Sequence, residues 1–141
     1  MSASQFTIAQ KVYEKITRAA VEAYPGEACG VLLGRNGETV ISEAVICGNE
    51  ETSDLSGRNY LISSKALLII ESEAAEKGLD VIGIFHSHPD KEAVLSGKDK
   101  DHMIPGLIYP VISVTSRGVS SVRGYAAGLS GEINEMHIRV N

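Results

Sequence analysis

The sequence lacks the features that usually mark nucleic-acid-binding, secreted and membrane-spanning proteins. Its net charge is −5 and its pI is about 5.3, whereas a nucleic-acid-binding surface usually needs a basic patch. It has no run of five like charges, and residues 1–4 lead into an amphipathic pattern without the basic start and apolar stretch of a secretory signal. No apolar run approaches the roughly 20 residues of a membrane helix. We therefore expect a soluble, cytoplasmic protein that binds neither nucleic acid nor membrane.

Cysteine is also scarce, which argues against a disulfide-stapled fold. Cys29 and Cys47 form no C-x-x-C pair, so we expect two reduced, buried thiols. A chain of 141 residues, of which 43% are hydrophobic, is long enough to bury one sizeable core. Because it shows no internal repeats and no low-complexity tracts, the sequence predicts a single domain over residues 1–141.

The first half of the chain predicts a helix followed by a β-hairpin. Apolar residues recur at helical spacing over 7–24, and a Pro-Gly pair then ends that helix. Residues 27–34 have the length and, after Glu27, the apolar character of a buried strand, and residues 39–46 are rich in β-branched side chains. Asn36-Gly37 between these two runs favours a tight turn. The polar stretch 48–58 has no clear period and is long enough to be a functional loop.

The second half predicts another long helix and a series of strands. Ser63 or Ser64 can cap a helix that runs to about Lys77 and is closed by Gly78. Strands are expected at 81–86, 107–115, 119–126 and 133–140, with a short helical stretch at 96–102. This order of elements favours an α/β protein of the α+β type, with a mixed, largely antiparallel β-sheet flanked by helices.

Residues 81–99 carry the strongest chemical signal in the chain. Their first five residues form an unbroken apolar run, which suits a strand buried on both faces. His86 and His88 follow two residues apart, so they project to the same side of that strand. Ser96 and Asp99 are one turn apart if a helix begins there. Two imidazoles and a carboxylate at a strand end and a helix start predict a divalent metal site with an open position, as in catalytic zinc sites.

Each part of this stretch also has a simpler interpretation. Most His-x-His pairs on strands are buried or surface histidines that bind no metal. Ser-x-x-Asp is also the pattern of a capping box, in which Ser96 caps a helix and Asp99 bonds back to it. The sequence alone leaves the cap and the ligand open at both positions. His102, one turn beyond Asp99, is expected to be a solvated helix residue.

Together with a glutamate far upstream, these residues resemble the JAMM (MPN+) zinc metalloproteases. The hallmark of that family is a glutamate ahead of a strand, then His-x-His-Pro, then Ser-x-x-Asp. This chain has Glu27, His86-Ser87-His88-Pro89, six further residues and Ser96-Gly97-Lys98-Asp99. The resemblance implies a cytidine-deaminase-like fold and a Zn²⁺ cofactor held by His86, His88 and Asp99. It also implies that Glu27 is the general base for the attacking water and that Ser96 donates to the developing oxyanion.

The resemblance also implies a class of substrate. The family cleaves peptide or isopeptide bonds after the C-terminal tail of ubiquitin-fold proteins. This chain has no large insertions and is similar to the prokaryotic members, several of which trim small sulfur-carrier proteins. We therefore expect a zinc peptidase that acts on a ubiquitin-fold sulfur-carrier protein or its conjugates. A deconjugating isopeptidase for a ubiquitin-like modifier is one alternative and a non-catalytic binding or scaffold module is another. The sequence leaves open whether the protein forms a homodimer.

Overall fold

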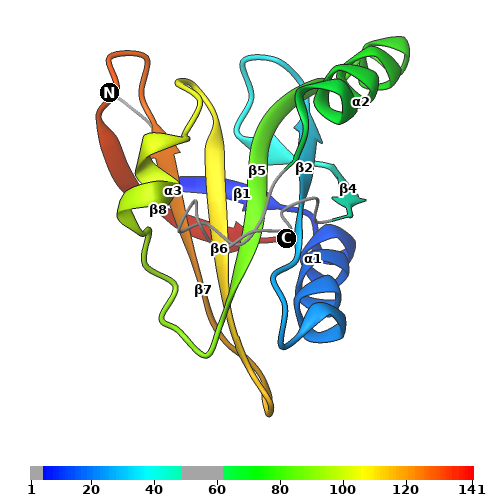
Figure 1. Cartoon of the computed structure of the whole chain (residues 1–141). Helices are drawn as coiled ribbons and strands as arrows, with labels where there is room; N and C mark the ends of the chain where they lie inside the picture. The colour runs from blue at the N-terminus through cyan, green and yellow to red at the C-terminus, as the bar shows by residue number, and fades with distance from the viewer. Residues whose placement is uncertain (1–4, 49–61) are drawn as a thin grey trace.

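The computed structural model describes residues 5–48 and 62–141, and the statements that follow refer to those residues. A mixed β-sheet forms the centre of this part of the chain, and helices pack on it (Figure 1). The strands are β1 (Gln5–Ile8), β2 (Cys29–Gly34), β3 (Val40–Ile41), β4 (Glu43–Cys47), β5 (Asp80–Pro89), β6 (Ile108–Thr115), β7 (Gly118–Ala127) and β8 (Ile133–Val140). The helices are α1 (Gln10–Ala23), α2 (Ser64–Glu76) and α3 (Gly97–Asp101). The predicted class, a mixed sheet flanked by helices, is confirmed.

The order of strands across the sheet is β3-β1-β8-β7-β6-β5-β2-β4. Four neighbouring pairs are antiparallel, namely β2–β4, β2–β5, β6–β7 and β7–β8. The pairs β5–β6, β1–β8 and β1–β3 are parallel. Because β5 lies between β2 and β6, both of its edges are hydrogen-bonded, and seven of its ten residues are buried. The continuous apolar run of β5 reflects this central position.

The helices divide between the two faces of the sheet. Helix α1 covers one face, where its buried side chains pack with Phe85 of β5; they are Val12, Ile16 and Ala20. On the opposite face, Ile70 and Ala74 of α2 pack on alternate residues of β2. The residues that flank α3 pack on that same face, in a cluster with Ile84 of β5. Side chains that alternate along β5 therefore face either α1 or the α2 and α3 side.

Several local predictions hold because nearby residues decide them. The amide of Glu38 donates to the Arg35 carbonyl at 3.0 Å, and Gly37 has a φ of 84°, so Asn36-Gly37 does form the tight turn. The hydroxyl of Ser63, rather than that of Ser64, accepts the Ala66 amide and caps α2. Gly78, with a φ of 73°, follows the end of that helix.

Two local predictions at the edge of the sheet are wrong. The helix expected from residue 7 begins at Gln10, because residues 5–8 form the short strand β1. Strand β1 pairs with β8 at the other end of the chain, and its side chains Phe6 and Ile8 are fully buried in the core beneath α1. The strand expected over 39–46 is split, since β3 pairs with β1 and β4 pairs with β2.

Two further expectations concern the polar loop and membrane-spanning helices. Of the predicted loop 48–58, all but Gly48 lies outside the described residues. Among the helices that the structure describes, none has the length and apolar character to cross a membrane.

Candidate metal centre

Strand β5 presents two histidines side by side on one face of the sheet. Successive side chains of a strand alternate, so His86 and His88 share the face of Ile84, while Ser87 points to the other. Both imidazoles are buried, with 1% of His86 and 7% of His88 exposed to solvent. The prediction that the two rings emerge on the same side of a central strand is therefore confirmed.

Helix α3 brings a carboxylate to the same place. The Ser96 hydroxyl accepts the Asp99 amide at 3.0 Å, and the Ser96 amide donates to Asp99 Oδ2 at 2.9 Å, which together form a capping box. The capping interpretation is thus confirmed. It does not exclude the other role, because the same Asp99 carboxylate is buried and faces both histidines. The helix cap fixes the carboxylate at the edge of the histidine pair.

The three side chains meet at one point through single atoms. His86 Nε2 lies 3.1 Å from His88 Nε2, and Asp99 Oδ2 lies 3.3 Å from the first nitrogen and 3.2 Å from the second. A tetrahedral zinc ion with bonds of about 2.0–2.1 Å separates its ligands by about 3.3–3.4 Å. The triangle of donor atoms is therefore close to one face of such a tetrahedron. Among the described residues, His86, His88 and Asp99 form the group that can hold a metal ion.

A backbone carbonyl fixes the orientation of one of the rings. His88 Nδ1 lies 2.9 Å from the Glu92 carbonyl oxygen, which can only accept, so Nδ1 carries the proton of that bond. In a neutral imidazole the lone pair is then on Nε2, the atom that faces Asp99 Oδ2 and His86. A lone pair against a carboxylate needs a cation between them, either a proton or a metal. Metal-ligating histidines commonly use their second nitrogen in the way that His88 uses Nδ1.

The pKa values of this cluster move in the directions that its charges require. Burial raises the pKa of the Asp99 carboxyl, but hydrogen bonds from His86, His88 and the Ser96 amide lower it more, to well below its usual range. Burial lowers the pKa of the His88 imidazole, but Asp99, the Glu92 carbonyl and the charge of Glu27 raise it above its ordinary value. Both directions show that the site favours positive charge beside the Asp99 carboxylate, as a set of metal ligands does.

Glu27 and Ser96 lie at a cavity that opens onto this cluster. The cavity has a volume of about 360 Å³ and is lined by Glu27, His88, Lys91, Glu92, Val94, Ser96 and Asp99. Glu27 precedes β2, the strand that pairs with β5, and its charge acts on His88. All five residues singled out from the sequence are thus assembled around one place, although Glu27 lies about 60 positions from the others.

The chain matches the family described as prokaryotic homologues of the JAB domain over residues 9–125. This match covers most of the chain and includes all five residues of the cluster and its cavity. The chain belongs to this JAB (JAMM/MPN) family. It is also 26% identical over 122 residues to a desampylase from Haloferax volcanii, a stretch that covers 83% of this chain and 86% of that protein.

Solved structures give the same fold for this JAB-family chain. A solution structure from Desulfitobacterium hafniense has a TM-score of 0.81 at 25% identity, and one from Salinibacter ruber has 0.72 at 26% identity. Each alignment covers 96% of this chain and 92% of the other. A JAB1/MPN-domain protein from Archaeoglobus fulgidus has a TM-score of 0.59 at 19% identity, covering 96% of this chain and 99% of that one.

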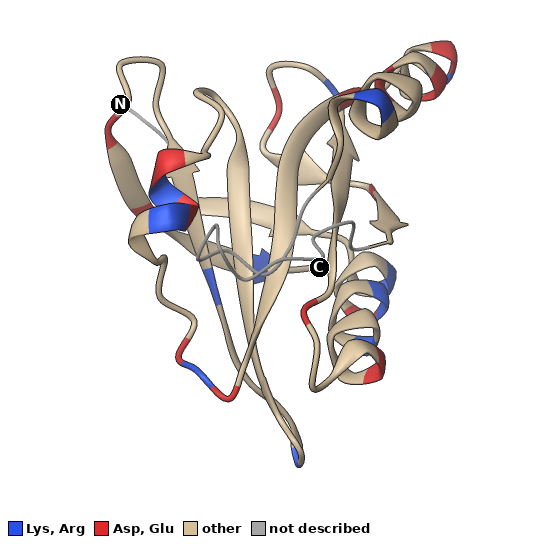
Figure 2. Ribbon diagram, in the orientation of Figure 1, with Lys and Arg blue, Asp and Glu red and all other residues tan. Residues whose placement is uncertain are grey.

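Other polar residues near the motif of the JAB-family chain separate into two groups. His102 stays exposed, with Nδ1 bonded to the Lys98 carbonyl at 2.8 Å, as expected of a solvated helix residue. Lys91 and Glu92, in the charged loop after β5 (Figure 2), line the cavity together with Val94. The sequence did not point to Val94 or to the Glu92 carbonyl, because nothing in the motif spacing shows which loop atoms turn inward.

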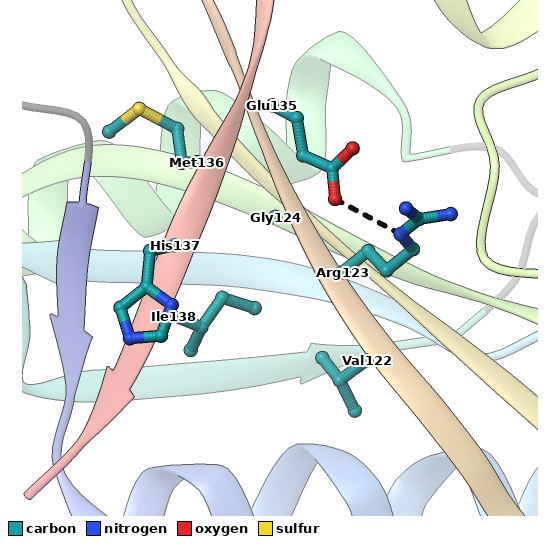
Figure 3. Close-up of a pocket in the computed structure, with 7 residues that line it drawn as sticks. All are labelled: Val122, Arg123, Gly124, Glu135, Met136, His137 and Ile138. Carbon is teal, nitrogen blue, oxygen red and sulfur yellow. Dashed lines mark hydrogen bonds and ion pairs between the residues drawn. The ribbon is translucent and has the colours of Figure 1, made fainter.

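A second hollow of about 470 Å³ lies over β7 and β8, apart from the histidine cluster (Figure 3). Arg123 Nε and Glu135 Oε2 form an ion pair of 3.0 Å there, while the His137 ring points away from that pair. His137 is not part of the group that can hold a metal ion. The histidine cluster and its cavity are therefore the better candidate for chemistry.

Proposed function

We propose that residues 1–141 form one zinc-dependent hydrolase domain that cleaves a peptide or isopeptide bond after the C-terminal tail of a ubiquitin-fold protein. The observation that carries the proposal is the triangle of donor atoms from His86, His88 and Asp99 beside a cavity that Glu27 and Ser96 also line. A cavity beside three ligands leaves room for a water or substrate at a fourth position, which is the arrangement of a catalytic rather than a structural metal site.

In this proposal His86 and His88 each give Nε2 to the metal and Asp99 gives Oδ2. Two imidazoles and a carboxylate form a ligand set that suits zinc. When bound, zinc supplies Lewis acidity, which lowers the pKa of water toward about 7 and polarises a substrate carbonyl. The hydrogen bond from His88 Nδ1 to the Glu92 carbonyl holds the ring in the tautomer that leaves Nε2 free to act as a ligand.

Glu27 transfers the proton, and Ser96 supplies a hydrogen bond. The Glu27 carboxylate, at the cavity wall, takes a proton from the attacking water and delivers it to the leaving amine. The Ser96 oxygen accepts the Asp99 amide, so its hydroxyl proton remains for donation to the carbonyl oxygen as that oxygen gains charge. Helix cap and oxyanion donor are thus compatible roles for one hydroxyl.

The family match and one relative are the grounds for proposing a ubiquitin-fold substrate. The likeness to a desampylase supports an isopeptidase that removes a ubiquitin-like modifier. Trimming of a sulfur-carrier protein is the alternative that follows from the match to the prokaryotic branch of the family. Both reactions need the same metal, base and oxyanion donor. They differ in the leaving group, which is a lysine side chain in the first and a C-terminal residue or short extension in the second.

Two substrates offered side by side test the proposal. One is a ubiquitin-fold sulfur carrier with a short peptide after its C-terminal Gly-Gly, and the other is the same carrier joined to a lysine of a target protein. Zinc-dependent cleavage of either supports the hydrolase, and the ratio of the two kcat/KM values assigns the leaving group. If zinc-loaded protein binds the carrier but cleaves neither substrate, the chain is a binding module instead.

A further inference from the structure

The segment that carries Glu27 is docked onto the end of β5 by hydrogen bonds outside the regular ladder. Glu27 itself lies between the end of α1 and the start of β2. Next to it, the Ser87 amide donates to the Ala28 carbonyl at 3.0 Å, as in an antiparallel pair. The reciprocal bond goes elsewhere, because the Ala28 amide donates to the Ser87 hydroxyl at 2.8 Å. A side chain thus replaces a backbone carbonyl where the chain leaves the sheet, and both residues are buried.

A second bond lies on the other side of Glu27 in the sequence. The Tyr24 hydroxyl, at the C-terminal end of α1, bonds to both carboxylate oxygens of Asp90 at 2.9 and 2.8 Å. Asp90 directly follows β5 and has a φ of 57°, in the left-handed region that aspartate tolerates better than most residues. Its amide donates to the Val114 carbonyl at 2.7 Å, so its backbone is fixed by the sheet. Asp90 is therefore a firm anchor for the tyrosine.

The Tyr24 hydroxyl is protonated over the whole neutral range and so acts as the donor in this bond. The bond to the Asp90 carboxylate, together with partial burial and the negative charge, raises the pKa of the Tyr24 hydroxyl above its usual value. A protonated phenol facing a carboxylate makes a charge-assisted bond, which is stronger than one between neutral groups. The two ends of the segment 24–28 are thus both held to β5 or to the residue that follows it.

We infer that Tyr24, acting through Asp90, is a positioning residue for Glu27. The inference rests on the proposed function, since it gives the Tyr24–Asp90 hydrogen bond a role in proton transfer by Glu27. A general base must lie within hydrogen-bond reach of its proton, and a misplacement of about 1 Å can cost on the order of 100-fold in rate. The Tyr24–Asp90 hydrogen bond restrains the segment before Glu27, and the bonds between Ala28 and Ser87 restrain the segment after it. Ser87 lies between the two histidines on β5, and Asp90 directly follows that strand.

The test removes one hydroxyl and measures catalysis and zinc content separately. The Tyr24→Phe variant is expected to lower kcat by roughly five- to tenfold on the carrier with a peptide extension, with KM and bound zinc unchanged. Tyr13→Phe is the matched control, because the Tyr13 hydroxyl, on the same helix, makes no hydrogen bond to the described residues. Asp90→Asn keeps an acceptor oxygen and is expected to retain most of kcat, whereas Asp90→Ala is expected to match Tyr24→Phe.

A measurement without substrate separates this inference from the proposed function. Amide hydrogen exchange at residues 26–28 is expected to rise at least severalfold in Tyr24→Phe, with exchange at Val31 unchanged. If the wild-type protein cleaves neither substrate but exchange at 26–28 rises in Tyr24→Phe, the Tyr24–Asp90 bond does restrain the segment and the proposed function fails. If cleavage occurs and Tyr24→Phe keeps the wild-type kcat, or if exchange at 26–28 does not change, the positioning role is overturned.

Discussion

Replacing Asp99 with asparagine changes the charge at the candidate metal centre while keeping the shape of the side chain. One oxygen of Asp99 faces both His86 and His88 and accepts the Ser96 amide. An amide oxygen can still accept that bond, so the cap of α3 is expected to survive. A neutral amide is a poorer zinc ligand than a carboxylate. Loss of a residue that only hydrogen-bonds to a metal ligand typically costs 10- to 100-fold in metal affinity. Because Asp99 is itself a proposed ligand, we expect Asp99→Asn to lose roughly 100-fold or more in zinc affinity.

The size of the effect follows from binding linkage. Zinc at 100 times its Kd stabilises the folded wild type by about 2.7 kcal/mol, and at the same concentration the variant gains about 0.4 kcal/mol. Since about 1 kcal/mol shifts the Tm of a chain of this size by roughly 4 °C, zinc is expected to raise the Tm by about 10 °C in the wild type and about 2 °C in Asp99→Asn.

Thermal unfolding followed by circular dichroism, with and without zinc after chelation, measures this difference. Asp101→Asn is the matched control, because Asp101 is an exposed aspartate at the end of the same helix. It should show the full wild-type shift. An equal zinc shift in wild type and Asp99→Asn would remove Asp99 from the ligand set, and no shift in the wild type would remove the metal centre altogether.

Three further predictions follow from the same geometry. Glu27→Gln should keep the zinc-induced rise in Tm but lose about 10²- to 10⁴-fold in kcat, and retained turnover would exclude Glu27 as the base. Ser96→Ala should lower kcat by roughly 10²- to 10³-fold and stability by about 1 kcal/mol, whereas a change in stability alone would leave only the cap. In metal-free protein the pKa of Asp99 is lower in the folded state than in the unfolded state. Its stabilising contribution is therefore complete above about pH 4 and is lost as the pH falls below that value. Urea unfolding between pH 5 and pH 3 should show a shallower loss of stability in Asp99→Asn than in the wild type, and parallel curves would contradict the assignment.

The parts of the fold that local residues decide could be predicted from the sequence. The apolar run of β5 indicates a strand buried on both faces. The turn at Asn36-Gly37 and the start of α2 at Ser63 depend on hydrogen bonds between residues that are close in sequence. The strands β1 and β3 could not be predicted in the same way. They have four and two residues, too few to show a period, and they exist because they pair with each other and β1 also pairs with β8.

The candidate site divides in the same way. Alternation along a strand places His86 and His88 together, and one helical turn relates Ser96 to Asp99, so these neighbours follow from spacing. The contacts that complete the cluster come from loop backbone and from distant segments. The Glu92 carbonyl that orients His88, and the bond of Tyr24 to Asp90 across 66 positions, leave no mark in sequence spacing.

The central claim is that the cluster of His86, His88 and Asp99 holds a zinc ion on which hydrolysis depends. The most direct test is the rate at which metal-stripped protein cleaves a ubiquitin-fold carrier extended at its C-terminal tail, measured before and after addition of one equivalent of zinc. We predict no detectable cleavage by the stripped protein and full recovery at one equivalent. An unchanged rate after stripping, or no cleavage of the peptide-extended and lysine-linked carriers with zinc present, would contradict it.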